Sequence, residues 1–375
     1  MPSIFSKLNI NDNLVNALNI EKISTPTSIQ EQAIPFIFEN KDIIASSDTG
    51  TGKTLAYLLP ILQRLDENSK ALQVVILAPT YELVIQIQKQ IESLIKNSGI
   101  EITAQPILGS VHIKRQIENL KKKKPQIIVA STGRLLELIS RKRIKMHTVK
   151  TIILDEADKL IDANNMVQTK AVIKTTMKDR QLMAFSATIP NSSIDKLTQM
   201  MKEPKVIQIE DDMISTLNIS HEYIVCDPRD KIKVLRNLAA NIKNLKAIVF
   251  INRSDELEVL ADKLKYHNLK VDCIHGSWEK AEREKAIRDF RNNKINLLVA
   301  SDIAARGLDF KGVTHIISID VPEDSKNYTH RAGRTGRAGE KGTSISIVTE
   351  YEVQFLQKFE RKLQISIKLV DKLAT

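Results

Sequence analysis

Three short groups of residues in this sequence have the types and spacing that phosphate chemistry needs. The first is Ser-Asp-Thr-Gly-Thr-Gly-Lys-Thr, from Ser47 to Thr54, between an apolar run and a helix-like pattern. In such a turn, backbone N–H groups face an anion, and glycines let the backbone come close. Lys53 would reach the terminal phosphates, and the Thr54 hydroxyl would bind Mg²⁺. Ser47 replaces the first glycine of the usual G-x-x-x-x-G-K-T motif, and a glycine-rich loop without a ligand is the alternative.

The second group is a pair of carboxylates, Asp155 and Glu156, directly after the apolar run 151–154. Beside a phosphate loop, Asp155 would hold a metal ion, mostly through water, and Glu156 would orient or deprotonate the attacking water. A solvated acidic turn is the alternative. Ser186-Ala187-Thr188 ends the next apolar run, but small hydroxyl residues often only cap helices.

The third group is His330-Arg331-Ala332-Gly333-Arg334-Thr335-Gly336-Arg337, with three arginines and two glycines. An arginine offers a planar, permanently charged set of donors, and one that reaches a transferring phosphate contributes ~10³–10⁵ in rate. The glycines would hold the loop close to another backbone. We therefore expect these arginines to reach phosphate, and a basic surface loop is the alternative.

Alternating strands and helices have to position these groups. The apolar run before the phosphate loop would suit a buried strand. After the loop, the expected strands are 74–78, 127–131, 151–154, 182–186 and 206–209, and the expected helices are 81–95, 112–120 and 135–139. Apolar strands that alternate with helices predict a parallel sheet covered on both faces. Ligands of such sheets lie at the carboxyl ends of the strands, where the phosphate loop is expected.

The same alternation restarts after residues 210–220, which are expected to form a linker. The expected strands are 221–226, 247–252, 271–274, 295–300, 315–319 and 343–348, and the expected helices are 231–242, 255–264, 280–290 and 351–363. The sequence thus predicts two similar α/β domains, 1–209 and 221–375. Only the first carries a Gly-Lys-Thr, which suggests that a nucleotide is clamped between them.

Composition favours a protein of the cytosol with a polyanionic partner. The 375 residues suggest about two domains, and 56 Lys and Arg against 45 Asp and Glu give a net charge of +11. Nucleic acid or an acidic membrane surface would suit that charge, and so would simple solubility. Cys226 and Cys273 lie in apolar runs without metal-ligand spacing, which indicates core residues in a reducing compartment. No signal peptide or membrane-spanning run is apparent.

Asp155-Glu156-Ala157-Asp158, together with the other groups in their order and spacing, resembles the motifs of DEAD-box ATP-dependent RNA helicases of superfamily 2. The resemblance covers nearly the whole chain and is to the short bacterial type, without a C-terminal extension. It implies two tandem RecA-like domains, each a mostly parallel sheet with helices on both faces. It also implies ATP and Mg²⁺ as cofactors and RNA as the partner, bound mainly through its backbone.

The resemblance assigns roles to individual residues. Catalysis is implied for Lys53, Asp155, Glu156, Arg334 and Arg337, and metal binding for Thr54 and Asp155. Nucleotide contacts are implied for Phe5 and Gln30 at the adenine, for Ser47, Asp48, Thr49, Gly50, Thr51, Gly52, Lys53 and Thr54 at the phosphates, and for Gly307 and Asp309, the latter at the ribose. RNA contacts are implied for Pro79, Thr80, Gly109, Ser131, Gly133, Arg134, Arg283 and Ser301. Coupling of hydrolysis to strand separation is implied for Asp158, Ser186, Thr188 and His330.

Most departures from the family pattern fall on the RNA motifs. They are Tyr81 for arginine, Ser110 for glycine, Ser131 and Thr132 for Thr-Pro, Lys280 for glutamine and Ser301 for threonine. The predicted function is ATP-dependent unwinding of short RNA duplexes or remodelling of RNA–protein complexes by a monomer. Bacterial members suggest ribosome assembly or RNA turnover, with ribosomal RNA as a partner. The alternatives are an ATP-gated RNA clamp with little turnover and a DNA-directed motor of the same superfamily.

Overall fold

The computed structural model describes residues 4–47, 50–187, 189–209, 218–274, 280–305, 310, 312–336 and 340–370. The chain divides into two compact units, Met1–Glu210 and Asp211–Thr375, called here the N-terminal unit and the C-terminal unit. The predicted linker begins at this division, and most of it lies outside the described residues. That the first unit is an ATP-binding helicase domain and the second a C-terminal helicase domain is still a prediction.

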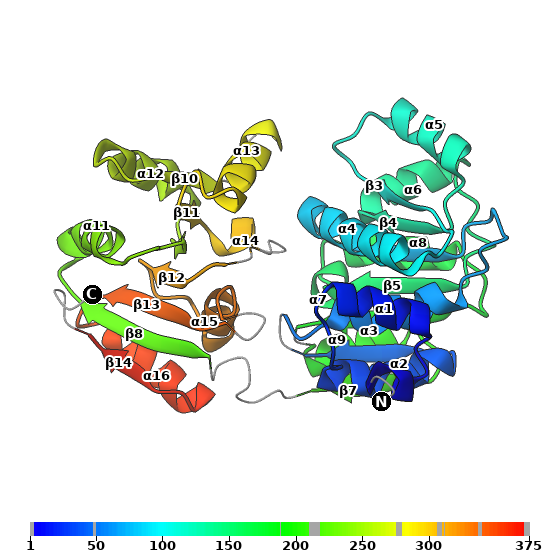
Figure 1. Cartoon of the computed structure of the whole chain (residues 1–375), viewed down its shortest axis with the longest axis horizontal. Coiled ribbons are helices and arrows are strands. Elements are labelled where there is room, and N and C mark those ends of the chain that lie inside the picture. Colours follow the sequence, from blue (N-terminus) through cyan, green and yellow to red (C-terminus); the bar gives the residue numbers. More distant parts are fainter. Residues whose placement is uncertain are drawn as a thin grey trace. The chain divides into compact units, whose positions relative to one another are not determined.

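A seven-stranded parallel sheet organises the N-terminal unit (Figure 1), in the order β3-β4-β2-β5-β6-β1-β7. The strands are β1 (Ile43–Ser46), β2 (Val74–Leu77), β3 (Ala104–Ile107), β4 (Ile127–Ala130), β5 (Thr151–Asp155), β6 (Gln181–Ser186) and β7 (Lys205–Gln208). Because every pair is parallel, all carboxyl ends meet at one edge of the sheet. That edge is where the predicted site residues follow the strands.

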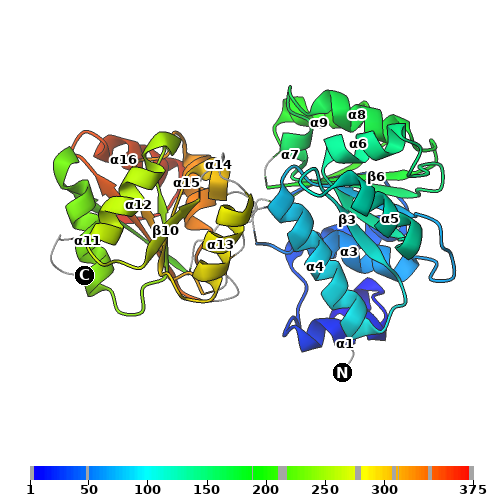
Figure 2. The same cartoon turned by 90° about the horizontal axis from the view of Figure 1, so that it is seen from above.

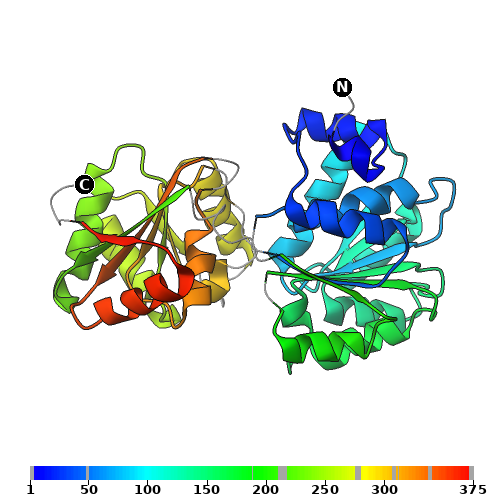
Figure 3. The same cartoon turned by 90° about the horizontal axis from the view of Figure 1, so that it is seen from below.

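Helices cover both faces of this sheet (Figures 2 and 3). The 3₁₀ helix η1 (Ile4–Leu8) and helices α1 (Asp12–Ile20), α2 (Ser28–Phe38), α3 (Lys53–Arg64) and α4 (Tyr81–Ser98) pack into one apolar core. Helices α5 (Ile113–Lys123), α6 (Thr132–Ser140), α7 (Ala157–Leu160), α8 (Met166–Lys174) and α9 (Asn191–Thr198) pack into the other. Successive strand residues alternate between the two cores, as Ile43 and Ile44 do, because side chains alternate across a strand.

The C-terminal unit repeats this plan with the order β10-β11-β9-β12-β13-β8-β14, again parallel throughout. Its strands are β8 (Ile219–Val225), β9 (Ala247–Phe250), β10 (Val271–Ile274), β11 (Leu297–Ala300), β12 (His315–Ser318), β13 (Gly342–Val348) and β14 (Ile367–Leu369). Its helices are η2 (Pro228–Asp230), α11 (Lys231–Asn241), η3 (Ser254–Glu256), α12 (Leu257–Tyr266), α13 (Lys280–Arg291), α14 (Asp302–Ala305), α15 (Ser325–Ala332) and α16 (Val353–Leu363).

The predicted fold class, two RecA-like α/β units with parallel sheets, is confirmed. Strands β3 and β14 were not predicted, and both lie at a sheet edge. In β3, Gln105 and Pro106 interrupt the apolar pattern, and proline is tolerated in a sheet mainly at its edge. None of the helices in the described ranges combines the length and the apolar character that a bilayer crossing needs.

Candidate functional site

The phosphate loop connects β1 to α3 and depends on two glycines in the left-handed region. Gly50 has φ +88° and Gly52 has φ +89°, a conformation that side chains other than glycine adopt at a cost. A Cβ atom on Gly52 would also collide with the side-chain amide of Gln30. Asp48 and Thr49, both predicted to contact phosphate, lie outside the described residues.

Hydrogen bonds of polar side chains connect residues within this loop. The hydroxyls of Ser47 and Thr51 lie 2.6 Å apart, and Lys53 Nζ donates to the carbonyl oxygen of Ser47 at 2.5 Å. The ammonium group therefore reaches back from the start of α3 to the first residue of the loop. Ser47 keeps the turn that glycine usually makes and adds a hydroxyl to it.

Gln30 links this loop to the start of α2. Its Oε1 accepts the backbone N–H of Thr27 in a capping box, and its Nε2 donates to the carbonyl of Gly52 at 3.1 Å. The residue predicted to contact adenine is therefore in contact with the phosphate loop. Phe5, predicted to stack nearby, is buried in the apolar core with 1 % exposure, and its contact with adenine stays a prediction.

Asp155 ends β5 and has only 5 % exposure. Its Oδ2 accepts a hydrogen bond from the Tyr57 hydroxyl at 2.8 Å, and its Oδ1 accepts the backbone N–H of Glu156 at 2.9 Å. Burial raises the pKa of Asp155 to about 6, and the hydrogen bond from Tyr57 opposes that shift, as does the positive charge of Lys53. A carboxylate that is buried in this way would gain from a bound cation.

Glu156 has φ +51° and stands directly before α7. Its Oε2 is ion-paired with Lys159 one turn further along the chain. Two of the residues predicted to couple hydrolysis to strand separation are also in contact, because the Ser186 hydroxyl donates to Asp158 Oδ1 at 2.5 Å. Thr188 lies outside the described residues. The acidic turn thus connects β5 to the end of β6.

The residues present fit a magnesium ion that is shared with a nucleotide. A hydroxyl and a carboxylate, from Thr54 and Asp155, are oxygen ligands of the kind that Mg²⁺ prefers. Among the described residues, no cluster of three or more His, Cys, Asp or Glu side chains would hold a metal by itself. Phosphate and water oxygens would therefore have to complete the coordination shell, as is usual for Mg²⁺ at phosphate sites.

The residues predicted to contact RNA follow β2, β3 and β4, which are neighbours in the sheet. Thr80 caps α4 by accepting the N–H of Leu83. Arg134 donates to the carbonyls of Gly109 at 2.5 Å and Val111 at 2.7 Å, so it joins the first turn of α6 to the loop between β3 and α5. Of the remaining predicted RNA residues in this unit, Pro79 and Ser131 directly follow β2 and β4, and Gly133 lies at the start of α6.

The predicted functions separate along one edge of the N-terminal sheet. Residues predicted to bind RNA follow β3, β4 and β2, whereas the phosphate loop, the carboxylates and Ser186 follow β1, β5 and β6. Strands β2 and β5 are adjacent, and they mark the border between the two groups. Both groups of predicted contacts therefore lie at one edge of the same sheet.

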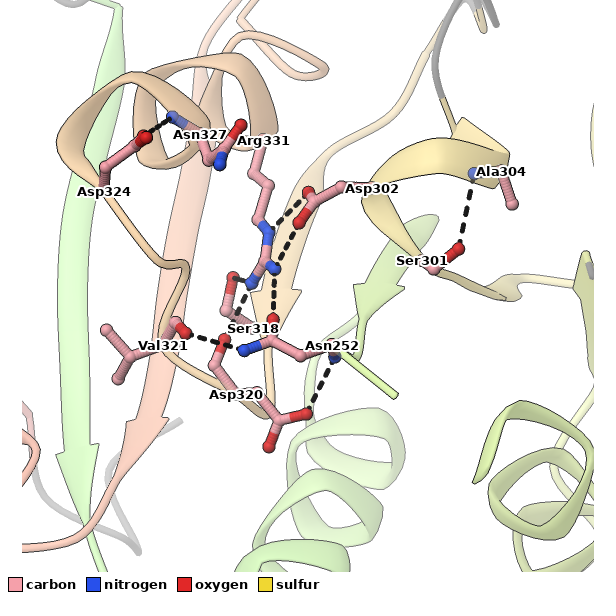
Figure 4. Close-up of polar contacts among 10 residues, drawn as sticks. All are labelled: Asn252, Ser301, Asp302, Ala304, Ser318, Asp320, Val321, Asp324, Asn327 and Arg331. Atoms are coloured by element: carbon pink, nitrogen blue, oxygen red, sulfur yellow. Dashed lines mark hydrogen bonds and ion pairs between the residues drawn. The ribbon is translucent and has the colours of Figure 1, made fainter. Parts of the chain in front are cut away.

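In the C-terminal unit, Arg331 of α15 is the centre of a buried polar network (Figure 4). Its guanidinium makes two bonds to Asp302, at 2.8 and 2.7 Å. It also donates to the carbonyl of Asp320 at 2.7 Å, to the Ser318 hydroxyl at 3.5 Å and to Asn252 Oδ1 at 2.6 Å. All five N–H donors of the guanidinium are therefore used.

This network corrects the expectation that all three arginines of the third group reach phosphate. Arg331 is only 2 % exposed, and its guanidinium lies 5.1 Å from the ring centroid of Phe250. It fixes α15 to the ends of three strands instead. Arg334 follows in the turn after α15, where its backbone N–H donates to the Arg331 carbonyl. Arg337 lies outside the described residues.

Two predicted RNA residues of the C-terminal unit converge on α14. Arg283 donates to the carbonyl of Ala304 at 3.1 Å, and the Ser301 hydroxyl accepts the N–H of Ala304 at 3.3 Å. His330 lies on α15 beside Arg331. Gly307 and Asp309 lie outside the described residues.

The buried hydrogen bonds of Tyr57 and Arg331 were not predicted from the sequence. Tyr57 lies in a pattern that only indicates a helix, and its partner Asp155 is far away along the chain. Arg331 was assigned to the wrong target because its buried partners come from three separate strand ends. No local signal marks either contact.

A phosphate loop between a buried strand and a helix, at the carboxyl edge of a parallel sheet, with carboxylates at the end of a nearby strand, defines a P-loop nucleotide-binding protein of the RecA-like class. Residues 27–197 match the DEAD/DEAH box helicase family, and residues 230–339 match the helicase conserved C-terminal domain.

Comparison with similar proteins indicates the family within this class. The chain is 43 % identical to the probable ATP-dependent RNA helicase YfmL of Bacillus subtilis, over 93 % of this chain and 92 % of the relative. It is 44 % identical to the DEAD-box ATP-dependent RNA helicase CshC of Bacillus cereus, over 90 % and 86 %. Dbp5 of Saccharomyces cerevisiae, solved with RNA and ADP BeF3, has 29 % identity and a TM-score of 0.88, with 99 % of this chain and 96 % of that chain covered.

The chain therefore belongs to the DEAD-box family of ATP-dependent RNA helicases. The family that the sequence motifs indicated is confirmed, together with an enzymatic activity of the ATP-dependent helicase class. The roles of the individual site residues remain predictions.

Proposed function

We propose that this protein hydrolyses ATP with Mg²⁺ and uses the energy to separate short RNA duplexes or remodel RNA–protein complexes. Lys53 would bind the terminal phosphates, Thr54 and Asp155 would hold the metal, and Glu156 would orient the attacking water. The metal would polarise the phosphate that is transferred and neutralise its developing charge.

One observation carries this proposal. The phosphate loop and the buried carboxylate of Asp155 lie at the same edge of one sheet. Phosphate binding, metal binding and water activation need groups arranged in this way.

Arginines of the C-terminal unit would take part in the hydrolysis of ATP. Arg334 and Arg337 follow the helix that Arg331 fixes, and such arginines stabilise charge on a transferring phosphate. We propose that binding of ATP and RNA brings these arginines to the phosphates of the N-terminal unit, and that this closure bends the bound strand. A duplex cannot follow the bend, so it opens locally.

RNA would be held mainly through phosphates and 2′-hydroxyls, hence with little sequence preference and with strong dependence on salt. The net charge of +11 suits this partner. A cytoplasmic monomer that acts in ribosome assembly or RNA turnover, on ribosomal RNA, belongs to the same proposal.

The direct test is Glu156→Gln. We expect phosphate release to fall by at least ~10²-fold, because the amide cannot accept a proton, while binding of a fluorescent ATP analogue is retained. Glu118→Gln on the exposed face of α5 is the matched control. Wild-type turnover in the Glu156 variant would contradict the assignment.

An RNA clamp with little turnover is the second candidate, and the substituted RNA motifs favour it. Thr132, one of the substituted positions, is buried at 6 % exposure, and Arg134 is bonded to the loop carbonyls of Gly109 and Val111. A clamp would release about one phosphate per bound RNA, whereas a helicase would show multiple turnovers. Equal stimulation by single-stranded DNA and RNA would instead indicate a DNA-directed motor.

A further inference from the structure

The side chain of Tyr57 lies inside the N-terminal unit, one turn along α3 from the phosphate loop. It is fully buried, and its ring centroid lies 5.2 Å from that of Phe185 in β6. The other buried residues of this helix are aliphatic or proline. A phenylalanine would fill the same space with the same ring, so packing explains the ring of Tyr57 but not its hydroxyl.

The hydroxyl donates a hydrogen bond to a predicted metal ligand. Its partner is Asp155 Oδ2, at 2.8 Å. The other oxygen of Asp155 accepts the backbone N–H of Glu156. Both oxygens of the carboxylate are therefore held, and one phenol connects the helix after the phosphate loop to the end of β5.

The orientation of such a carboxylate is important for binding of Mg²⁺ in particular. Mg²⁺ requires nearly octahedral geometry and tolerates little displacement of its ligands. Groups that orient a ligand from behind typically change metal affinity 10–100-fold when they are removed. A neutral hydroxyl can orient a carboxylate without placing a competing positive charge beside it, as a lysine or arginine would.

We propose that Tyr57 is a positioning residue for the magnesium–nucleotide complex. Its hydroxyl holds Asp155 in the orientation that the metal needs, and it acts through this residue. This inference rests on the proposed function, because it requires that Asp155 serves the metal.

The test is Tyr57→Phe in the full chain, with Mn²⁺ as the metal probe. We expect the affinity of Mn²⁺ for the protein–ADP complex, measured by electron paramagnetic resonance, to fall about 10-fold or more. ADP binding in EDTA should stay at the wild-type level. ATP hydrolysis should need more Mg²⁺ for half-maximal rate and recover at saturating Mg²⁺, a dependence that a purely structural role would not produce.

Tyr328→Phe is the matched control. Tyr328 is buried at 2 % exposure in the C-terminal unit, and its hydroxyl lies 2.9 Å from His221 Nδ1. This variant also loses a buried hydroxyl, but it should keep the wild-type affinity for Mn²⁺.

Unchanged or tighter Mn²⁺ binding in Tyr57→Phe would overturn the inference. Asp155→Asn separates this failure from failure of the proposed function. If Asp155→Asn weakens Mn²⁺ binding and Tyr57→Phe does not, only the role of Tyr57 is wrong. If Asp155→Asn also binds Mn²⁺ and ADP as the wild type does, the metal assignment in the proposed function is wrong.

Discussion

At the scale of single residues, burial controls the protonation of His221 in β8. The imidazole is 6 % exposed, Nδ1 lies 2.9 Å from the Tyr328 hydroxyl, and Nε2 has no hydrogen-bond partner among the described residues. Burial lowers the pKa of His221 to about 4. The folded protein therefore favours the neutral imidazole.

This shift predicts that the C-terminal unit loses stability in mild acid. The unfolded chain takes up a proton near pH 6.5, whereas folded His221 resists protonation until about pH 4. The contribution is thus present above pH 6.5 and is lost as pH falls toward 4, by up to about 3 kcal/mol. Hydrogen exchange of the β8 amides at several pH values measures it.

His221→Phe keeps a ring beside Tyr328 and removes the titrating group, so its stability should depend less on pH across that window. His267→Gln, at an exposed histidine, should follow the wild type. Identical pH profiles for the wild type and His221→Phe would refute the assignment.

The types and spacing of the site residues could be predicted from the sequence, but the contacts between distant residues could not. The phosphate loop and the carboxylate pair were predicted because each group is continuous in sequence and phosphate chemistry limits its composition. The Tyr57–Asp155 bond and the two bonds of Arg331 to Asp302 join distant parts of the chain. Such pairings depend on strand order, which no local pattern encodes.

At the scale of elements, the buried hydrogen bonds of Arg331 attach α15 to the ends of β9, β11 and β12. We predict that Arg331→Met destabilises the C-terminal unit by about 3–5 kcal/mol, because Asp302 would be left partly buried without its cation. Urea unfolding followed through the C-terminal unit measures the loss.

Arg253→Met is the control for this prediction. Arg253 pairs with Asp255 and Glu256, but its side chain is 67 % exposed, so solvent screens the interaction and we expect little change in stability. Equal stability of the Arg331 variant and the wild type would show that the buried network does not hold α15.

The predicted elements were those with strong apolar periodicity. All central strands of both sheets were expected, because strands buried on both faces have continuous apolar sequences. The signal is weaker at the sheet edges, where β7 and β10 were expected but β3 and β14 were not. Strand β14 is both short and partly exposed. Helices α8 and α9 were missed, and both are short, with nine and eight residues.

At the scale of the whole molecule, the proposed reaction needs residues of both units. We predict that Arg334→Ala lowers the rate of ATP hydrolysis by about 10³-fold or more, although the phosphate loop belongs to the other unit. Nucleotide binding should change much less, because Lys53 and the loop remain. Phosphate release at saturating ATP and RNA measures the effect.

Arg229→Ala, at an exposed arginine of the C-terminal unit, should hydrolyse ATP at the wild-type rate. Undiminished hydrolysis by the Arg334 variant would mean that the N-terminal unit needs no arginine from its neighbour.

The position of β1 in its sheet has a consequence for how the protein is made. Among the described strands, β1, which leads into the phosphate loop, pairs with β6 and β7, so that Ile43 lies opposite Met183 and Lys205. During translation this early strand is made long before either partner, because chains grow at about 5–20 residues per second. We therefore expect the nucleotide cradle to form only when translation of the first unit is nearly finished.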